Sequence, residues 1–392
     1  MLPLEGLTVV SLEQAVAAPL CTRHLADHGA RVIKIERPGA GDFARGYDET
    51  VHGLSSHFVW LNRGKESVTL DLKHAEAREA LSKLVAAADV LVQNLAPGAA
   101  ARLGFDFATL APRHQRLVVA DISGYGDSGP YRDKKAYDTL IQAEAGLMSV
   151  TGLPDTPSRS GISVADIAAG MYAYSGILTA LLQRDRSGRG TRVEVSMLEA
   201  LVEWMGFPIY YGHYRGRPPA RTGASHPSIA PYGPHRTGDG KMVVLGLQNE
   251  REWAVFCDRV LGRPDLAGDR RFSSNSARVA NRADLTRLIE EAFAALGAAD
   301  VVARLDSAGI ANGRLNAIAD VVAHPQLAAR DRWRQVETSA GRVAATLPPA
   351  NLEGVAPAMG AVPSLGEHTE AVLRSLGYSS AAIENLRASG AI

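Results

Sequence analysis

The feature that most constrains this chain is an alternation, across its N-terminal half, of short apolar segments with stretches suited to helices. Short and nearly continuous apolar strands separated by helices are typical of a parallel sheet that is covered on both faces. The sequence therefore predicts an α/β fold with a Rossmann-like parallel sheet. The expected strands lie at 7–12, 31–36, 68–72, 90–92, 117–122 and 192–195, and the expected helices at 19–28, 74–88, 97–103, 137–148, 166–184 and 197–211.

The turn after the first expected strand lacks the glycines with which such a fold usually binds a dinucleotide. It reads EQAVAAP from Glu13 to Pro19, and no Walker A sequence occurs in the chain. A nicotinamide or flavin bound in the standard way is therefore not expected. The two cysteines, Cys21 and Cys257, are too few for a disulfide framework or a zinc site, so we expect no metal and a reducing, cytoplasmic location.

Composition changes after residue 215, where the Gly/Pro-rich segment GRPPARTGA at 216–224 is typical of a linker. We expect a large domain at 1–215 and a smaller α/β domain at 225–323. The expected elements beyond the linker are strands at 242–245 and 333–336 and helices at 250–261, 282–296, 300–307, 369–376 and 380–388.

Charge and hydropathy narrow the range of partners. Lys and Arg together number 42, as do Asp and Glu, so the chain has no net charge and no sign of non-specific nucleic-acid binding. The longest uncharged apolar run, 167–182, is shorter than the roughly 20 residues that cross a bilayer, and the N-terminus does not resemble a signal peptide. We expect no membrane partner.

Asp166 is the only charged residue between Arg159 and Arg184, at the start of an expected helix. An aspartate there usually caps the helix by accepting backbone N–H bonds. The same place also suits a nucleophile, because a helix N-terminus favours the ionised carboxylate. Residue types alone leave both interpretations open.

Six stretches in a fixed order decide between them. They are PLEGL at 3–7 through GARVIKIERPG at 29–39 with GD at 41–42, NRGKESVTLDLK at 62–73, DVLVQNL at 89–95, G-x4-D-x3-G at 161–170, GRG at 188–190 and LGEHT at 365–369. On these the chain resembles the family III CoA-transferases, the CaiB/BaiF group. The resemblance implies that 330–392 returns to the large domain, that the small domain is inserted, and that two ring-like subunits interlock as a homodimer.

The resemblance also implies a mechanism in which Asp166 attacks an acyl-CoA thioester. A mixed anhydride forms, the CoA thiolate returns to give an aspartyl-CoA thioester, and the acceptor acid takes the CoA through a second anhydride. CoA and acyl-CoA are then substrates, and no permanently bound cofactor is implied. The positions that match CoA contacts of the family are Val16, Arg37, Leu70, Lys73, Asn94, Leu95, Arg102, Leu103 and Lys135.

The segment GAGDFARGYD at 39–48 resembles the branch that joins CoA to itaconate, mesaconate or citramalate, with succinyl-CoA as donor. A second substrate carboxylate would then need a partner, for which Arg45, Arg221 and His226 are the candidates, although Arg45 could instead pair with nearby Asp42 or Asp48. A formyl- or oxalyl-CoA branch is disfavoured, because Val16 stands where that branch has a glutamine and its glycine-rich loop is not found. The substrate-site candidates are Gln14, Arg45, Tyr137, Arg221 and His226.

Two alternatives remain. An α-methylacyl-CoA racemase needs two acid/base groups flanking the α-carbon. The matching positions here hold Tyr137 and Gln248. Tyrosine is a poor base at neutral pH and glutamine cannot titrate, so racemisation is disfavoured. The second alternative is a non-catalytic acyl-CoA-binding protein in which Asp166 is only a helix cap.

Overall fold

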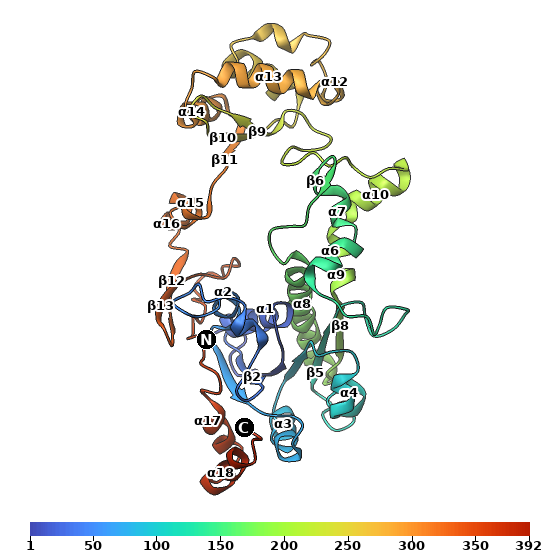
Figure 1. Ribbon diagram of the computed structural model, residues 1–392, viewed down its shortest axis with the longest axis vertical. Coiled ribbons are helices and arrows are strands. Elements are labelled where there is room, and N and C mark those ends of the chain that lie inside the picture. The colour runs from blue at the N-terminus through green and yellow to red at the C-terminus, as the bar shows by residue number, and fades with distance from the viewer. The chain divides into compact units, whose positions relative to one another are not determined.

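The computed structural model describes residues 1–392 and divides into two compact units (Figure 1). The large unit comprises residues 1–145, 160–205 and 327–392, and the small unit comprises residues 146–159 and 206–326. The division differs from the expected one in that residues 146–159 and 206–215 belong to the small unit. The helix expected at 197–211 is in fact α9 (Met197–Trp204) followed by α10 (Gly206–Arg215). Pro208 has no N–H to continue the first helix, which accounts for the break.

A six-stranded sheet in the order β3-β2-β1-β4-β5-β8 forms the centre of the large unit. All of its strand pairs are parallel, as the apolar pattern predicts. The order reverses between β1 and β4, which is the arrangement of a doubly wound fold. The strands are β1 (Thr8–Leu12), β2 (Arg31–Glu36), β3 (Lys65–Thr69), β4 (Val90–Gln93), β5 (Val118–Ser123) and β8 (Arg192–Ser196).

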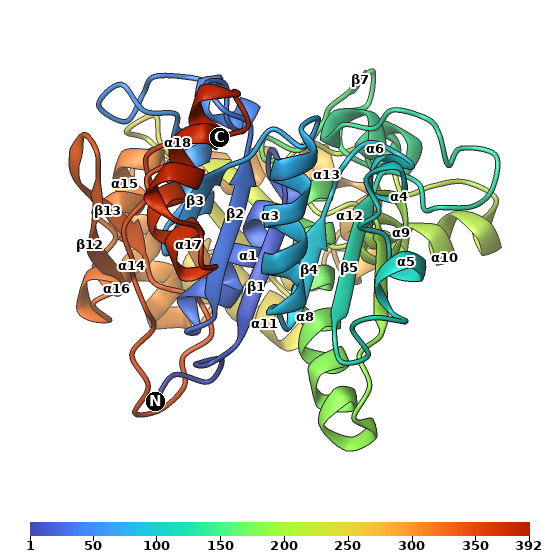
Figure 2. The same cartoon turned by 90° about the horizontal axis from the view of Figure 1, so that it is seen from below.

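Helices cover both faces of this sheet (Figure 2). On one face, side chains of α3 (Ala75–Ala86), α17 (Thr369–Ser375) and α18 (Ser380–Ala388) join the strands in one apolar core. On the other face lie α1 (Ala17–Asp27) and α8 (Val164–Ser187), which pack closely against each other. At Gly170 of α8 an added Cβ would lie 2.6 Å from the carbonyl oxygen of Ala17, so this packing needs a glycine.

By length and composition α8 is the one helix apolar enough to cross a membrane. It packs against α1, β5 and β8 of the large unit. The remaining elements of the large unit are η1 (Phe43–Gly46), α2 (Ser56–Asn62), α4 (Ala99–Leu103), α5 (Phe107–Leu110), α6 (Asp138–Glu144) and the hairpin β12 (Trp333–Thr338) with β13 (Gly341–Thr346).

The small unit is α/β, built on the antiparallel sheet β11-β10-β9. Its own apolar core includes Trp253, Phe256, Phe272 and Phe293, all of them buried. The strands and helices are α7 (Leu147–Val150), β6 (Gly152–Leu153), β7 (Thr156–Pro157), β9 (Tyr232–Arg236), β10 (Met242–Gly246), α11 (Glu250–Val255), η2 (Phe256–Val260), η3 (Pro264–Ala267), α12 (Asn275–Ala280), α13 (Arg282–Phe293), α14 (Ala298–Ala308), β11 (Ala311–Arg314) and α15 (Ile318–Val322), with α16 (Pro325–Ala329) at the junction.

Candidate active site

The predicted CoA-binding residues follow the carboxyl ends of the strands. Since the strands are parallel, these ends share one edge of the sheet, and ligands of such folds bind where the strand order reverses. That point lies between the segments after β1 and β4, which carry Val16 and Asn94. Arg37 follows β2, Leu70 and Lys73 follow β3, Leu95 follows β4, Arg102 and Leu103 lie on α4, and Lys135 precedes α6.

The segment after β1 is held in an unusual backbone conformation. Asn94 brackets Gln14, with its Oδ1 2.9 Å from the Gln14 N and its Nδ2 2.9 Å from the Gln14 O. Ala15 has a φ of 65°, a region that non-glycine residues seldom occupy, and its N–H donates to Asp42 Oδ1 at 3.1 Å. Asp42 and Asn94 therefore fix the loop at the point where the strand order reverses.

Behind that loop lies a buried group of four charged side chains, which we call the buried quartet: Glu13, Lys34, Asp42 and Lys65. Lys34 Nζ is 2.7 Å from Asp42 Oδ2 and 3.3 Å from Glu13 Oε1, and Lys65 Nζ is 2.7 Å from Glu13 Oε1. Burial alone would raise the pKa of Glu13, but Lys65 and Lys34 together hold it below its ordinary value. Two cations and two anions leave the quartet neutral, as burial requires.

Asp166 does not cap its helix. The N-cap of α8 is Ser163, and Asp166 lies in the first turn beyond it. Its partly buried carboxylate forms no hydrogen bond or ion pair. Burial, and secondarily the negative charge of Asp138, raise the pKa of Asp166 to about 7. A carboxylate that accepts no hydrogen bond and has a raised pKa is suited to nucleophilic attack.

The first turn of α8 is held instead by α6. Asp138 Oδ1 accepts the N–H of Ala165 at 2.9 Å, and Asp138 Oδ2 accepts Gln142 Nε2 at 2.6 Å. Gln142 Oε1 in turn accepts the N–H of Ser160 at 2.8 Å. The capping function that Asp166 could have served therefore belongs to a side chain of another helix.

Tyr47 lies near Asp166 in the large unit, and Tyr137 lies near Tyr47. Burial, Asp42 and then Asp166 raise the pKa of Tyr47 to about 12, and Tyr137 also contributes. Tyr137, a predicted substrate residue, is the exposed N-cap of α6. With its pKa at about 12, Tyr47 keeps its proton at neutral pH and is a hydrogen-bond donor rather than a base.

The cations predicted to bind CoA are free to do so. Arg37, Lys73 and Lys135 are exposed and have no partner, and Arg102 has only a 3.4 Å contact with the carbonyl of Pro97. The apolar candidate Leu70, by contrast, has a side chain that is not accessible to a ligand. Leu70 is 1% exposed and lies in the sheet core, so only its backbone could reach a ligand.

The three residues expected to bind a second carboxylate are already engaged. Arg45 donates to Glu36 through Nε and Nη2, at 2.8 and 2.7 Å, and lies on the ring of Phe58. Neither Asp42 nor Asp48, the partners considered from sequence, pairs with it. Arg221 donates to the carbonyls of Leu153, Ser149 and Pro154, and His226 stacks on Tyr232.

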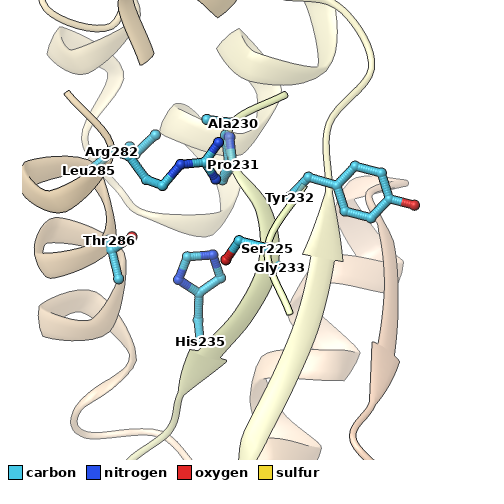
Figure 3. Close-up of a pocket in the computed structure, with 9 residues that line it drawn as sticks. All are labelled: Ser225, Ala230, Pro231, Tyr232, Gly233, His235, Arg282, Leu285 and Thr286. Atoms are coloured by element: carbon cyan, nitrogen blue, oxygen red, sulfur yellow. The ribbon is translucent and has the colours of Figure 1, made fainter. Parts of the chain in front are cut away.

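A small cavity lies beside the His226 segment in the small unit (Figure 3). Arg282 Nη2 donates to the carbonyls of His226 and Ile229, and therefore holds this segment. His235 faces the cavity, and its buried Nδ1 has no partner. None of the predicted site residues lines the cavity, whose residues are Ser225, Ala230, Pro231, Tyr232, Gly233, His235, Arg282, Leu285 and Thr286.

No group of three His, Cys, Asp or Glu side chains is close enough together to hold a metal ion. His24 and His28 have the i, i+4 spacing of some metal sites, but His24 Nε2 is 3.1 Å from the Arg23 guanidinium. Burial and the neighbouring Arg23 lower the pKa of His24 to about 3. His24 is therefore neutral, and both histidines pack on Tyr174.

Sequence reasoning missed Asp42, Asp138, Gln142 and Tyr47. One signal was available for two of them, since Asp138 and Gln142 are four residues apart at the start of an expected helix and would share one face. No sequence pattern near Asp138 or Gln142 indicates that they form hydrogen bonds with Ala165 and Ser160.

Comparison with known proteins identifies the family of this chain. The family model of CoA-transferase family III matches residues 4–369. Acetyl-CoA:oxalate CoA-transferase of Acetobacter aceti is 38% identical over 84% of this chain and 85% of its own length. Succinyl-CoA–D-citramalate CoA-transferase of Chloroflexus aurantiacus is 31% identical over 95% of this chain and 94% of its own length.

The crystal structure of a CaiB/BaiF family protein from Brucella suis has a TM-score of 0.85 at 34% identity, with 96% of this chain and 99% of that chain covered. Its mixed α/β architecture with a large parallel sheet matches the one described above. Both the sequence match and the structural match extend over nearly the whole chain. This chain is therefore an enzyme that belongs to CoA-transferase family III.

Proposed function

We propose that this enzyme transfers CoA between two carboxylic acids, with Asp166 as the nucleophile. An Asp166 oxygen bonds to the thioester carbon of the donor, the C–S bond breaks, and the CoA thiolate leaves. The thiolate then attacks the Asp166 carbonyl of the mixed anhydride, which releases the donor acid and leaves an aspartyl-CoA thioester. The acceptor carboxylate repeats the two steps in reverse order. Each step exchanges one acyl bond for another, so no ATP or metal is consumed.

The observation that carries this proposal is the state of the Asp166 carboxylate. It is unbonded, partly buried and has a pKa raised to about 7, whereas an aspartate that served as a cap would be bound to backbone N–H groups and would have a low pKa. The N-terminus of α8 offers backbone dipoles that stabilise the oxyanions formed during attack. Because Asp138 supplies the cap of α8, the structure does not support the alternative in which Asp166 is only a helix cap.

CoA is proposed to bind along the carboxyl edge of the large sheet. Arg37, Lys73 and Lys135 offer cations without partners, and the phosphates of CoA need such partners. The loop fixed by Asp42 and Asn94 lies at the reversal of strand order, which is where this class of fold binds ligands.

For the acids we propose a C4–C5 dicarboxylate such as itaconate, mesaconate or citramalate, with succinyl-CoA as donor. The likeness to a relative that acts on D-citramalate supports this choice. The relative that acts on oxalate means that oxalate belongs in the same screen. Because Arg45 is committed to Glu36, the candidates of the large unit for the second carboxylate are Tyr47, Tyr137 and Gln14.

We also propose an interlocked cytoplasmic homodimer. The interlocking and the location rest on the family resemblance and on the cysteine content. The support for an interface is the exposed aromatic surface of α10, where Phe207, Tyr210 and Tyr214 are 55%, 68% and 79% exposed. A surface of this kind usually marks an interface.

The test is a CoA-exchange screen followed by mass spectrometry, with succinyl-CoA and acetyl-CoA as donors and a panel of mono- and dicarboxylic acids as acceptors. New acyl-CoA species should form with wild type and not with Asp166→Asn. Incubation of a 2-methylacyl-CoA in heavy water tests the racemase alternative, and deuterium at the α-carbon without CoA exchange would favour it.

A further inference from the structure

The Asp166 carboxylate interacts electrostatically with a second carboxylate, Asp138, whose position is fixed. Asp138 cannot turn away, because both of its oxygens are bonded, one to the N–H of Ala165 and one to Gln142. Gln142 is itself fully buried and also holds Ser160. The nucleophile and its like-charged neighbour are thus tied to the same turn of α8.

We propose that Asp138 is a positioning residue that raises the free energy of the ionised Asp166 carboxylate relative to the acylated states of Asp166. The inference rests on the proposed role of Asp166. A negative charge on Asp166 is repelled by Asp138, whereas the mixed anhydride and the aspartyl-CoA thioester carry no charge on that side chain. The charge leaves with the CoA thiolate in the first step and with the released acid in the second.

Burial and the charge of Asp138 are the two causes that shift the pKa of Asp166, and no cation lowers it. Around Asp166, α6 contributes Asp138, and the segment after η1 contributes the neutral Tyr47. The helices α1 and α9 and the strands β5 and β8, which also pack on α8, contribute no charge that interacts with Asp166. Burial adds to the repulsion, because it too penalises the ionised form.

Asp138 and Asp166 differ in their hydrogen bonds. Asp138 lies at the positive end of α8 and accepts two hydrogen bonds, whereas Asp166 accepts none. Of the two neighbouring carboxylates, Asp166 is therefore the one that is free to attack a thioester.

The experiment compares wild type with Asp138→Asn. Asn keeps an oxygen to accept the Ala165 N–H but has no charge. The first readout is kcat/KM against pH, and the second is the fraction of enzyme found as a covalent CoA adduct by intact mass after incubation with succinyl-CoA, or with acetyl-CoA if that is the donor. We expect the acidic limb of kcat/KM to move to lower pH and the adduct fraction to fall. If the limb moves by one pH unit, kcat/KM on that limb should change about tenfold relative to wild type.

Two control variants separate charge from structure. Asp133→Asn removes a charge from an exposed side chain before α6 and should leave both readouts at wild-type values. Gln142→Leu removes the support of Ser160 and the same Gln142–Asp138 hydrogen bond that Asp138→Asn loses, but it keeps the charge of Asp138. In this variant kcat should therefore fall while the acidic limb does not move to lower pH. If Asp138→Asn does not fold, Asp138→Ser keeps a common capping group and serves instead.

An acidic limb that stays in place and an unchanged adduct fraction in folded Asp138→Asn would overturn this inference alone, provided that Asp166→Asn is inactive. Turnover of Asp166→Asn at the wild-type rate would instead overturn the proposed function.

Discussion

Removing the charge of Lys34 should destabilise the large unit strongly. Lys34→Met keeps much of the length and apolar character of the side chain but takes a cation out of the buried quartet. Glu13 would retain Lys65 at 2.7 Å, whereas Asp42 would keep only hydrogen bonds from the N–H groups of Ala15 and Ala44. One fully buried carboxylate is thus left without a cation, which typically costs about 3–5 kcal/mol.

The assay is urea unfolding followed by circular dichroism at neutral pH. With a slope of about 2–3 kcal/mol per M, the midpoint of the large unit should fall by roughly 1–2 M. Lys83→Met is the matched control, because Lys83 is an exposed lysine paired with Glu79, and its loss should change stability by less than about 1 kcal/mol.

The double variant Lys34→Met/Asp42→Asn tests the cause. Asn can still accept the N–H of Ala15 and carries no charge, so the double variant should be more stable than Lys34→Met alone. A single variant whose stability stays within about 0.5 kcal/mol of wild type, or a double variant that simply adds the two losses, would refute the reasoning.

The remaining predictions concern Asp166, CoA and the helix packing. Asp166→Asn should lower transfer at least about a thousandfold. Because the folded pKa of about 7 lies above the unfolded value, ionising Asp166 costs stability as pH rises toward 7, so this variant should unfold at higher urea than wild type at pH 8 and lose that advantage near pH 4. Wild-type kcat/KM should fall about tenfold per unit below pH 7, and a profile flat down to pH 5 would contradict the raised pKa. Arg37→Ala should raise the KM for acyl-CoA about tenfold or more with a smaller effect on kcat, and an unchanged KM would exclude Arg37 from the CoA site. Gly170→Ala should cost about 1–3 kcal/mol in urea, because its Cβ would meet the Ala17 carbonyl, whereas Gly206→Ala, with open space around the added Cβ, should be neutral.

Several parts of the fold are visible in the sequence because their signal is local. The strands β1, β2, β4 and β5 are apolar runs bounded by helices, and β8 follows a Gly-rich turn. The strand β3 begins at Lys65, before the predicted start at residue 68. The prediction missed its first residues because they are polar. Lys65 is nevertheless buried, since Glu13 from the segment after another strand neutralises it. Because the partner of Lys65 is distant in the sequence, the hydropathy of the neighbouring residues cannot indicate that Lys65 is buried.

The sequence by itself determined the alternation that builds a parallel sheet, and its motifs singled out Asp166 by resemblance. The tertiary structure alone decided what each polar group binds. Asp138, which lies far from Ala165 along the chain, caps α8 by accepting the Ala165 N–H. Arg45 pairs with Glu36 rather than with the nearer Asp42 or Asp48. The physical reason is that periodicity and turn residues act over a few neighbours, whereas a hydrogen bond or an ion pair forms between whichever groups folding brings within about 3 Å. The proposed reactivity of Asp166 rests on the bonds that Asp138 makes and on the absence of hydrogen bonds to Asp166 itself.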